Sequence, residues 1–264
     1  MNRPLHWIWS TPRAVSTALE RCMLNVPGLG VEHEPFTDCY YFGSERRSER
    51  YGRRPPAGAA GEAPAHDSAA RPCEAQEACR RLERRRETGP VLVKELAFQG
   101  EPYVPDSLLA ATRSIVLLRR PRRVHASLVK LKPDFTDDEF GFDALLRVAE
   151  RLAALSAPML LVDGDELQRR PAETVSEVCR FLGLPFSTAL LSWDDGRVRR
   201  WRPEERDSQA PWHATLERSR GLVRTAVRDV PVPPGRRALV RRAEAVHERL
   251  KAICARAPDR AEAV

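Results

Sequence analysis

Five short apolar runs recur along the chain, each about the length of one buried β-strand. Between the runs, apolar residues fall three and four positions apart, as they do on one face of a helix; Leu19, Cys22 and Met23 begin the first such pattern. Strands that alternate with helices predict a parallel sheet covered by helices on both faces. The predicted strands cover residues 5–9, 30–34, 91–96, 114–119 and 159–162.

The remaining helices predicted from this periodicity cover about residues 74–87, 124–131, 145–155, 175–182 and 239–253. The pattern therefore predicts a single three-layer α/β domain over residues 1–264, with a mostly parallel sheet. One segment does not fit the alternation. Residues 53–72 contain four prolines and few large apolar side chains, so we expect them to form a flexible surface insertion.

Composition narrows the functional classes. The chain has 264 residues and a net charge of +7, which suits an anionic partner, but no basic stripe interleaved with aromatic residues indicates nucleic acid. No apolar run approaches the roughly 18 residues that span a bilayer, and the six cysteines form no C-x-x-C pair. We expect a cytoplasmic, bacterial protein that binds neither nucleic acid nor metal and has no membrane span. A homo-oligomer is compatible with the sequence.

The turn after the first predicted strand lies within WSTPRAVSTALER, residues 9–21. Ligands of parallel sheets bind at the carboxyl ends of the strands, and this turn brings Arg13, Ser16 and Thr17 to the start of a helix. Backbone N–H groups and the positive end of the helix dipole attract anions at such a place. The alternative is an ordinary helix cap, in which Glu20 completes a capping box. The sequence contains no Walker A motif.

A second candidate for anion binding follows the fourth predicted strand. Arg119 ends this strand, Pro121 suits the first turn of a helix, and Ser127 lies on that helix. The Arg119 guanidinium and the Ser127 hydroxyl would donate hydrogen bonds to one phosphate from two sides. The alternative is that Arg119 is a surface cation.

Together the two elements resemble the sulfotransferases that use 3′-phosphoadenosine 5′-phosphosulfate. In that family a loop similar to P-[KR]-S-G-[ST]-[ST] holds the 5′-phosphosulfate, and an R-x-P-x-x-x-x-x-S element holds the 3′-phosphate, here through Arg119 and Ser127. Residues 162–186 resemble a further segment of the family, and residues 33–36 (HEPF) and 93–96 (VKEL) resemble its small microbial branch. The resemblance implies a fold like that of P-loop nucleotide hydrolases and a role in secondary metabolism. The corresponding loop residues are Arg13, Ala14, Val15, Ser16 and Thr17.

Three departures from the family pattern give separate expectations. Arg13 replaces the usual lysine and donates as a planar fork that stays charged. Val15 replaces the usual glycine, and because a β-branched residue resists positive φ, we expect ordinary helical angles there. The family's C-terminal lid motif is not visible, so we expect residues 187–235 to form an irregular lid or acceptor region, with residues 219–221 as the closest candidate for a closing loop.

The acid–base and charge-stabilising groups are expected at the ends of the second and third strands. A hydroxyl acceptor needs a general base, and Glu34 and His33 are the two candidates. Strand alternation would point them to opposite faces, so only one of them would face the site. We favour Glu34 because Pro35 ends the strand directly after it. An alternative is that Glu34 pairs with Arg13 or a helix N-terminus. Lys94 is a candidate cation for sulfuryl transfer, or alternatively a partner of Glu95.

The expected reaction moves a sulfuryl group from 3′-phosphoadenosine 5′-phosphosulfate to a hydroxyl or amine of a small-molecule acceptor, leaving adenosine 3′,5′-bisphosphate. It needs no metal, and we interpret the carboxylates of residues 163–166 as a strand-to-helix turn. Two other functions stay open: a P-loop kinase-like phosphotransferase and a non-catalytic nucleotide-binding relative. An aromatic or lipid-like acceptor would be lined by some or all of Trp7, Trp9, Phe36, Tyr40, Tyr41 and Phe42, which alternatively form core.

Overall fold

The computed structural model describes residues 3–50, 74–199, 203–224 and 230–257. Its centre is a sheet of five parallel strands in the order β2-β3-β1-β4-β5. This confirms the predicted α/β class, and each observed strand lies within one residue of its predicted bounds at both ends. The strands are β1 (Leu5–Ser10), β2 (Gly30–His33), β3 (Val91–Leu96), β4 (Arg113–Leu118) and β5 (Met159–Asp163).

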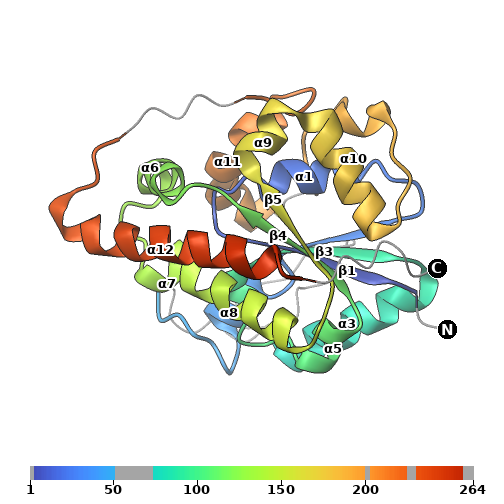
Figure 1. Ribbon diagram of the computed structural model, residues 1–264, viewed down its shortest axis with the longest axis horizontal. Coiled ribbons are helices and arrows are strands. Elements are labelled where there is room, and N and C mark those ends of the chain that lie inside the picture. The colour runs from blue at the N-terminus through green and yellow to red at the C-terminus, as the bar shows by residue number, and fades with distance from the viewer. Residues whose placement is uncertain (1–2, 51–73, 200–202, 225–229, 258–264) are drawn as a thin grey trace.

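Helices cover both faces of the sheet (Figure 1). On one face, α1 (Ser16–Met23) and α10 (Pro171–Leu182) pack on a cluster that includes Ile8, Ile115 and Val162. On the other, α8 (Phe142–Ala154) and α12 (Arg237–Cys254) pack on a cluster that includes Trp7 and Val116. The other α-helices are α2 (Thr37–Phe42), α3 (Ala75–Thr88), α4 (Ala97–Gly100), α5 (Asp106–Ala110), α6 (Pro121–Leu131), α7 (Asp137–Phe140), α9 (Gly164–Arg169) and α11 (Pro203–Glu217).

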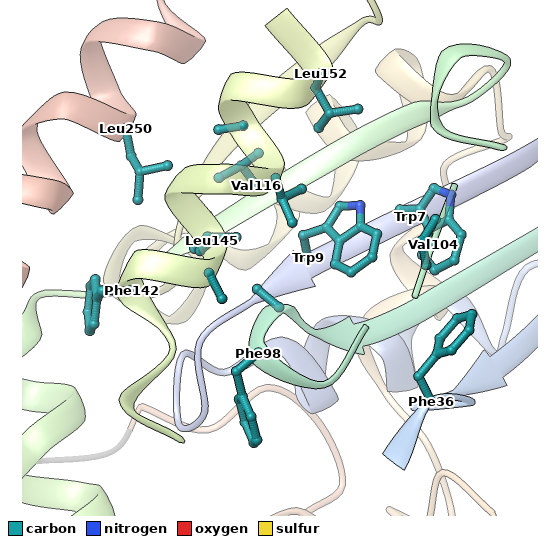
Figure 2. Packing of buried hydrophobic residues seen from close by; sticks show 14 of the residues in the cluster. Trp7, Trp9, Phe36, Phe98, Val104, Val116, Phe142, Leu145, Leu152 and Leu250 are labelled. Atoms are coloured by element: carbon teal, nitrogen blue, oxygen red, sulfur yellow. The ribbon is translucent and has the colours of Figure 1, made fainter. Parts of the chain in front are cut away.

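The N-terminal aromatic residues belong mainly to the core. Trp7 and Trp9 are fully buried and stack with ring centroids 4.6 Å apart, and Phe36 stacks on Trp7 (Figure 2). Tyr40 is buried against Phe98. The prediction of an acceptor pocket lined by these rings is therefore wrong for the tryptophans and Phe36. Trp7 and Trp9, two positions apart in β1, face the larger apolar cluster, and Phe36, just before α2, packs on Trp7.

The region expected to be irregular contains a helix. Within residues 187–235 the structure has the 15-residue helix α11, together with 3-10 turns at Thr188–Leu191 and Pro234–Arg236. The sequence pattern did not indicate a helix here for two reasons: Pro211 lies inside α11, and the polar and apolar residues of α11 are poorly separated into two faces. The expected insertion at residues 53–72 lies outside the described residues. Within the described residues, no helix is both long enough and apolar enough to cross a membrane.

Candidate active site

A cavity of about 260 Å³ lies at the carboxyl ends of the strands, where ligands of parallel sheets bind. It receives side chains from the turns after β1, β2 and β4, from β3, and from α11. The sequence-predicted residues Glu34 and Lys94 line it, as do Arg13, Val15, Ser16, Thr17 and Arg119. Three further predicted residues lie next to this lining. His33 contacts Glu34, Ser127 contacts Arg13, and Ala14 lies between Arg13 and Val15 in the chain.

The β1–α1 turn has a strained backbone. Val15 is the N-cap of α1 and has φ 75°, and Arg13 has φ 61°, so both adopt the left-handed conformation. The expectation of ordinary helical angles at Val15 is wrong. The reason is tertiary packing: Val15 packs against the apolar cluster on the α1 face, and a Cβ at Gly164 would lie only 2.5 Å from the carbonyl oxygen of Ala14. Contacts on both sides of the turn therefore impose a conformation that the residue type disfavours.

The capping-box alternative for this turn is also wrong. No side chain caps the N-terminus of α1, and the Glu20 carboxylate instead contacts His33. Ser16, Thr17 and Ala18 line the cavity, so the first turn of α1 opens onto it. The positive end of the helix dipole therefore faces the cavity, as an anion site requires.

Arg13 joins the two sequence elements that were predicted to bind anions. Its Nε donates to Ser127 Oγ at 3.0 Å, and its Nη1 donates to the Trp212 carbonyl oxygen at 2.9 Å. The guanidinium also lies 5.9 Å from the centroid of the Trp212 ring. Burial, reinforced by nearby Arg119, lowers the pKa of Arg13 to about 10, which leaves it cationic at neutral pH. One cation thus connects the β1–α1 turn, α6 and α11.

Arg119 is buried beneath the same turn. Its Nε donates to Asp165 Oδ1 at 3.1 Å, and its Nη1 donates to the Arg13 carbonyl oxygen at 3.2 Å. Asp163 caps α9 by accepting from the backbone N–H groups of Asp165 and Glu166. The interpretation of this acidic segment as a strand-to-helix turn is therefore confirmed. Arg119 is not the surface cation of the alternative, since it supports the turn from inside.

The ends of β2 and β3 hold an ion pair. Lys94 is 1% exposed, and its Nζ contacts Glu34 Oε1. The alternatives that paired Lys94 with Glu95, and Glu34 with Arg13, are wrong. Glu95 projects from the opposite face of β3 and accepts from the backbone N–H groups of Phe36 and Leu96, each at 2.9 Å. Burial, with the Glu34 charge as a further cause, raises the pKa of Glu95 to about 8.

His33 and Glu34 lie on the same side of the chain, contrary to the expectation from strand alternation. Strand β2 ends at His33, and Glu34 has φ 45°, which turns its side chain back toward the cavity. Glu34 Oε1 lies 3.9 Å from His33 Nε2. On its other side, His33 Nδ1 lies 2.8 Å from Glu20 Oε2. A buried imidazole thus lies between two carboxylates.

Sequence reasoning considered two residues of this site but did not assign them to it. Glu20 was interpreted only as part of a helix cap, and the apolar spacing around it gave no sign of its contact with His33. His213 on α11 lines the cavity, with its ring centroid 5.7 Å from that of His33. Burial lowers the pKa of His213 to about 4, despite the opposing effect of the Glu34 charge. His213 is therefore neutral at physiological pH.

The other end of the cavity is lined by apolar and polar side chains. Leu96, Phe98 and Leu128 contribute apolar surface, and Tyr41 contributes a phenol. Glu139 closes this end: it accepts from Lys132 Nζ at 2.6 Å and from Tyr41 Oη at 3.1 Å. In the parts of the chain that the structure describes, no group of three or more His, Cys, Asp or Glu residues is arranged to hold a metal ion.

Comparison with known proteins agrees with this geometry. The sequence profile of the sulfotransferase domain family matches residues 6–257. The fold and site define an α/β protein with a cavity at the carboxyl ends of its parallel strands, and the chain belongs to the sulfotransferase domain family. The sulfotransferase domain from the Synechococcus PCC 7002 olefin synthase has the same fold. It is 16% identical, with a TM-score of 0.51 over 93% of this chain and 95% of that domain.

Two curated relatives match a shorter part of the chain. Branched-chain-amino-acid aminotransferase-like protein 2 of Arabidopsis thaliana is 29% identical over 129 residues, and its protein 1 counterpart is 27% identical over 129 residues. Each match covers 49% of this chain but only 22% of the Arabidopsis protein. The matched length is thus about a fifth of each of these relatives.

Proposed function

We propose that this protein transfers the sulfuryl group of 3′-phosphoadenosine 5′-phosphosulfate to a hydroxyl, or an amine, of a small-molecule acceptor by in-line displacement. Membership of the sulfotransferase domain family supports the reaction class. The observation that carries the proposal is the junction at Arg13. It contacts Ser127, and its carbonyl oxygen accepts from Arg119. Two candidate phosphate-binding elements, whose arginines are 106 residues apart, are therefore in contact, which supports a single nucleotide site.

The donor would lie with its two charged ends on these two elements. The 5′-phosphosulfate would contact the first turn of α1 and the Arg13 fork, through residues Arg13, Ala14, Val15, Ser16 and Thr17. The 3′-phosphate would contact Ser127 and the side of Arg119 that lines the cavity. Arginine and a helix N-terminus both suit dianionic phosphate groups without help from a metal.

Glu34 is our candidate for the general base. It lines the cavity, whereas His33 lies behind it. Proton transfer to a positioned carboxylate typically contributes about 100- to 10,000-fold to rate. Lys94 and Arg13 lie beside the same space and would stabilise the charge that develops on the sulfuryl and bridging oxygens. The Lys94–Glu34 contact holds the acid–base group and one cation together before the acceptor arrives.

The acceptor would occupy the end of the cavity near Phe98 and Glu139. Leu96, Phe98 and Leu128 suit an aromatic ring or an aliphatic chain, and Tyr41 and Lys132 offer hydrogen-bond donors at the far end. We therefore propose an acceptor with an apolar body, either aromatic or lipid-like. Trp212 and His213 bring α11 into the lining of the same cavity.

Two measurements test the proposal against its alternatives. Arg119→Ala should weaken adenosine 3′,5′-bisphosphate more than adenosine 5′-monophosphate in calorimetric titration, and equal losses would rule out the 3′-phosphate role. A screen of hydroxyl and amine acceptors for the mass gain of one sulfuryl group tests turnover. Tight binding of the bisphosphate without transfer to any acceptor would favour the non-catalytic relative. Magnesium-dependent turnover of ATP would favour the kinase-like phosphotransferase.

A further inference from the structure

His33 lies between two carboxylates, next to the lining of the cavity. Glu20, from α1, contacts its Nδ1 through both carboxylate oxygens, at 3.0 and 2.8 Å. Glu34 Oε1 lies 3.9 Å from its Nε2. The side chains of Glu20 and His33 are 1% and 6% exposed, while that of Glu34 is 16% exposed and reaches the cavity. The three groups therefore form a chain of contacts that begins in the protein interior at Glu20 and ends at the cavity at Glu34.

We propose that Glu20 and His33 form a proton relay behind Glu34, in which Glu20 is a positioning residue; this inference rests on the sulfuryl transfer proposed above. In this arrangement neutral His33 carries its proton on Nδ1 and donates it to Glu20. This fixes the tautomer and presents the Nε2 lone pair to Glu34. A carboxylate that orients an imidazole in this way also stabilises the imidazolium that forms when Nε2 takes a proton.

The step balances in atoms and charge. The acceptor oxygen attacks sulfur and forms the new S–O bond, while the bond from sulfur to the bridging oxygen breaks. The bridging oxygen leaves with that electron pair as part of adenosine 3′,5′-bisphosphate. The acceptor proton passes to Glu34. Glu34 then passes it to His33 Nε2, 3.9 Å away in this structure, once its carboxylate turns into hydrogen-bond reach or one water molecule bridges the two, so that Glu34 returns to its ionised form beside Lys94. The imidazolium then loses its proton to solvent before the next turnover.

Other charged groups around His33 are compatible with this relay. Lys94 pairs with His33 in the register of β3 and β2 and contacts Glu34. His213 faces the His33 ring from α11, and its pKa of about 4 means that it does not compete for the proton at neutral pH. Arg13 lies near His213. The cations oppose a positive charge on His33, whereas the carboxylates of Glu20 and Glu34 favour it.

A purely structural role predicts different behaviour. A buried ion pair contributes little net stability compared with apolar residues of similar size, so stability alone gives weak grounds for the Glu20–His33 contact. The relay instead predicts that the proton affinity of His33 appears in the pH dependence of turnover. The rate should rise with pH as the His33 imidazolium loses its proton. The acid limb of the kcat/KM profile should therefore reflect the proton affinity of His33, which Glu20 raises.

The test compares Glu20→Gln and His33→Gln with the wild type. Sulfuryl transfer is measured with labelled 3′-phosphoadenosine 5′-phosphosulfate and 2-naphthol, a phenol that matches the apolar end of the cavity. We expect kcat to fall about 10- to 100-fold in each variant with the acceptor KM unchanged. The acid limb should move to lower pH by about 1 unit in Glu20→Gln, and by about 2 units in His33→Gln, where a carboxylate replaces an imidazole as the last proton acceptor.

Glu32→Gln is the matched control. Glu32 is next to His33 on β2 and is also buried, but it pairs with Arg81 and Arg85 and lies outside the cavity. Its substitution should leave the acid limb in place. An unchanged acid limb in both Glu20→Gln and His33→Gln, in an enzyme that transfers the label, would overturn the relay while leaving the proposed function intact.

A second readout works without turnover. In ¹⁵N-histidine NMR of the full chain, the relay predicts that neutral His33 carries its proton on Nδ1, and that Glu20→Gln reduces this preference. A neutral His33 protonated on Nε2 would overturn the relay, because Nε2 then has no lone pair to accept a proton. If the wild type transfers no label to any acceptor, the proposed function fails, and the NMR measurement still decides the tautomer.

Discussion

The two halves of the cavity use charge in different ways. At the ends of β1 and β4, Arg13 and Arg119 contact hydroxyl and carbonyl oxygens as well as Asp165, and both belong to motifs that the sequence displays. At the ends of β2 and β3, Lys94 and His33 each contact a carboxylate that no sequence motif had assigned to them. The first half has arginines that could bind an anion, and the second half has ionisable groups that are paired with groups of opposite charge or proton affinity.

Under the proposed function, this difference suits the first half to binding the donor and the second half to proton transfer. Cations whose partners are mainly neutral oxygens keep an attraction for phosphate and sulfate. A base held by a neighbouring cation stays ionised until the acceptor proton reaches it. Removing a charged side chain should therefore lower ligand affinity in the first half and turnover in the second.

The largest effect is expected from Arg13→Ala. It removes a cation of the cavity lining, and each charge-assisted hydrogen bond that Arg13 would donate to the nucleotide contributes about 1.5–3 kcal/mol. Affinity for adenosine 3′,5′-bisphosphate should fall roughly 1,000-fold in calorimetric titration. Arg21→Ala, which removes an arginine of α1 whose contacts lie outside the cavity lining, is the control and should bind as the wild type does. Wild-type affinity in Arg13→Ala would show that this half of the cavity does not bind the nucleotide.

The next effect is on turnover. Glu34→Gln should lower kcat by about 100-fold or more while leaving bisphosphate affinity unchanged, since it removes the base and not an anion ligand. It also leaves Lys94 buried without its carboxylate partner, which is destabilising. The double variant Glu34→Gln/Lys94→Met should recover thermal stability but not activity. A decrease in kcat of only a few-fold would move the role of base to His33.

A smaller effect concerns the pH dependence of stability at the end of β3. The folded-state pKa of Glu95, about 8, is above its unfolded value of 4.5, so the folded protein keeps a proton that the unfolded chain loses. Its contribution to stability is complete below the unfolded pKa and is lost as pH rises through the folded pKa. The free energy of unfolding should fall by about 2 kcal/mol between pH 6 and 8 in urea denaturation. Glu95→Gln should show a flatter dependence, and an identical slope in both proteins would contradict this assignment.

The smallest effect is expected at Val15. Its left-handed backbone costs roughly 1–2 kcal/mol, and glycine removes that cost but adds entropy to the unfolded chain and loses packing. Val15→Gly should therefore change the free energy of unfolding by less than about 1 kcal/mol, with bisphosphate affinity maintained. A loss of several kcal/mol would show that the packing of Val15, and not its backbone strain, dominates.

The sequence predicted the scaffold well because its information is local. Parallel strands buried on both faces are continuous apolar runs. The start of α6 at Pro121 and the end of α10 at Gly183 are likewise set by single residues. The motif around Arg13 and the element from Arg119 to Ser127 were likewise visible as short patterns.

The errors arose where distant segments decide the conformation. The positive φ of Val15 depends on packing against the apolar cluster and on the close approach of Gly164. The contact of Glu20 with His33 depends on how α1 lies against β2, and Glu34 escapes strand alternation because its own φ is positive. Helix α11 was missed because Pro211 and weak periodicity conceal it.

The decisive measurement is sulfuryl transfer in the absence of divalent metal. The wild-type protein is incubated with labelled 3′-phosphoadenosine 5′-phosphosulfate, an acceptor identified by mass shift, and EDTA. We predict that sulfated acceptor and adenosine 3′,5′-bisphosphate form in equal amounts, and that Arg13→Ala and Glu34→Gln both abolish most of this signal. A wild-type protein that transfers no sulfuryl group but turns over ATP when magnesium is restored would contradict the account.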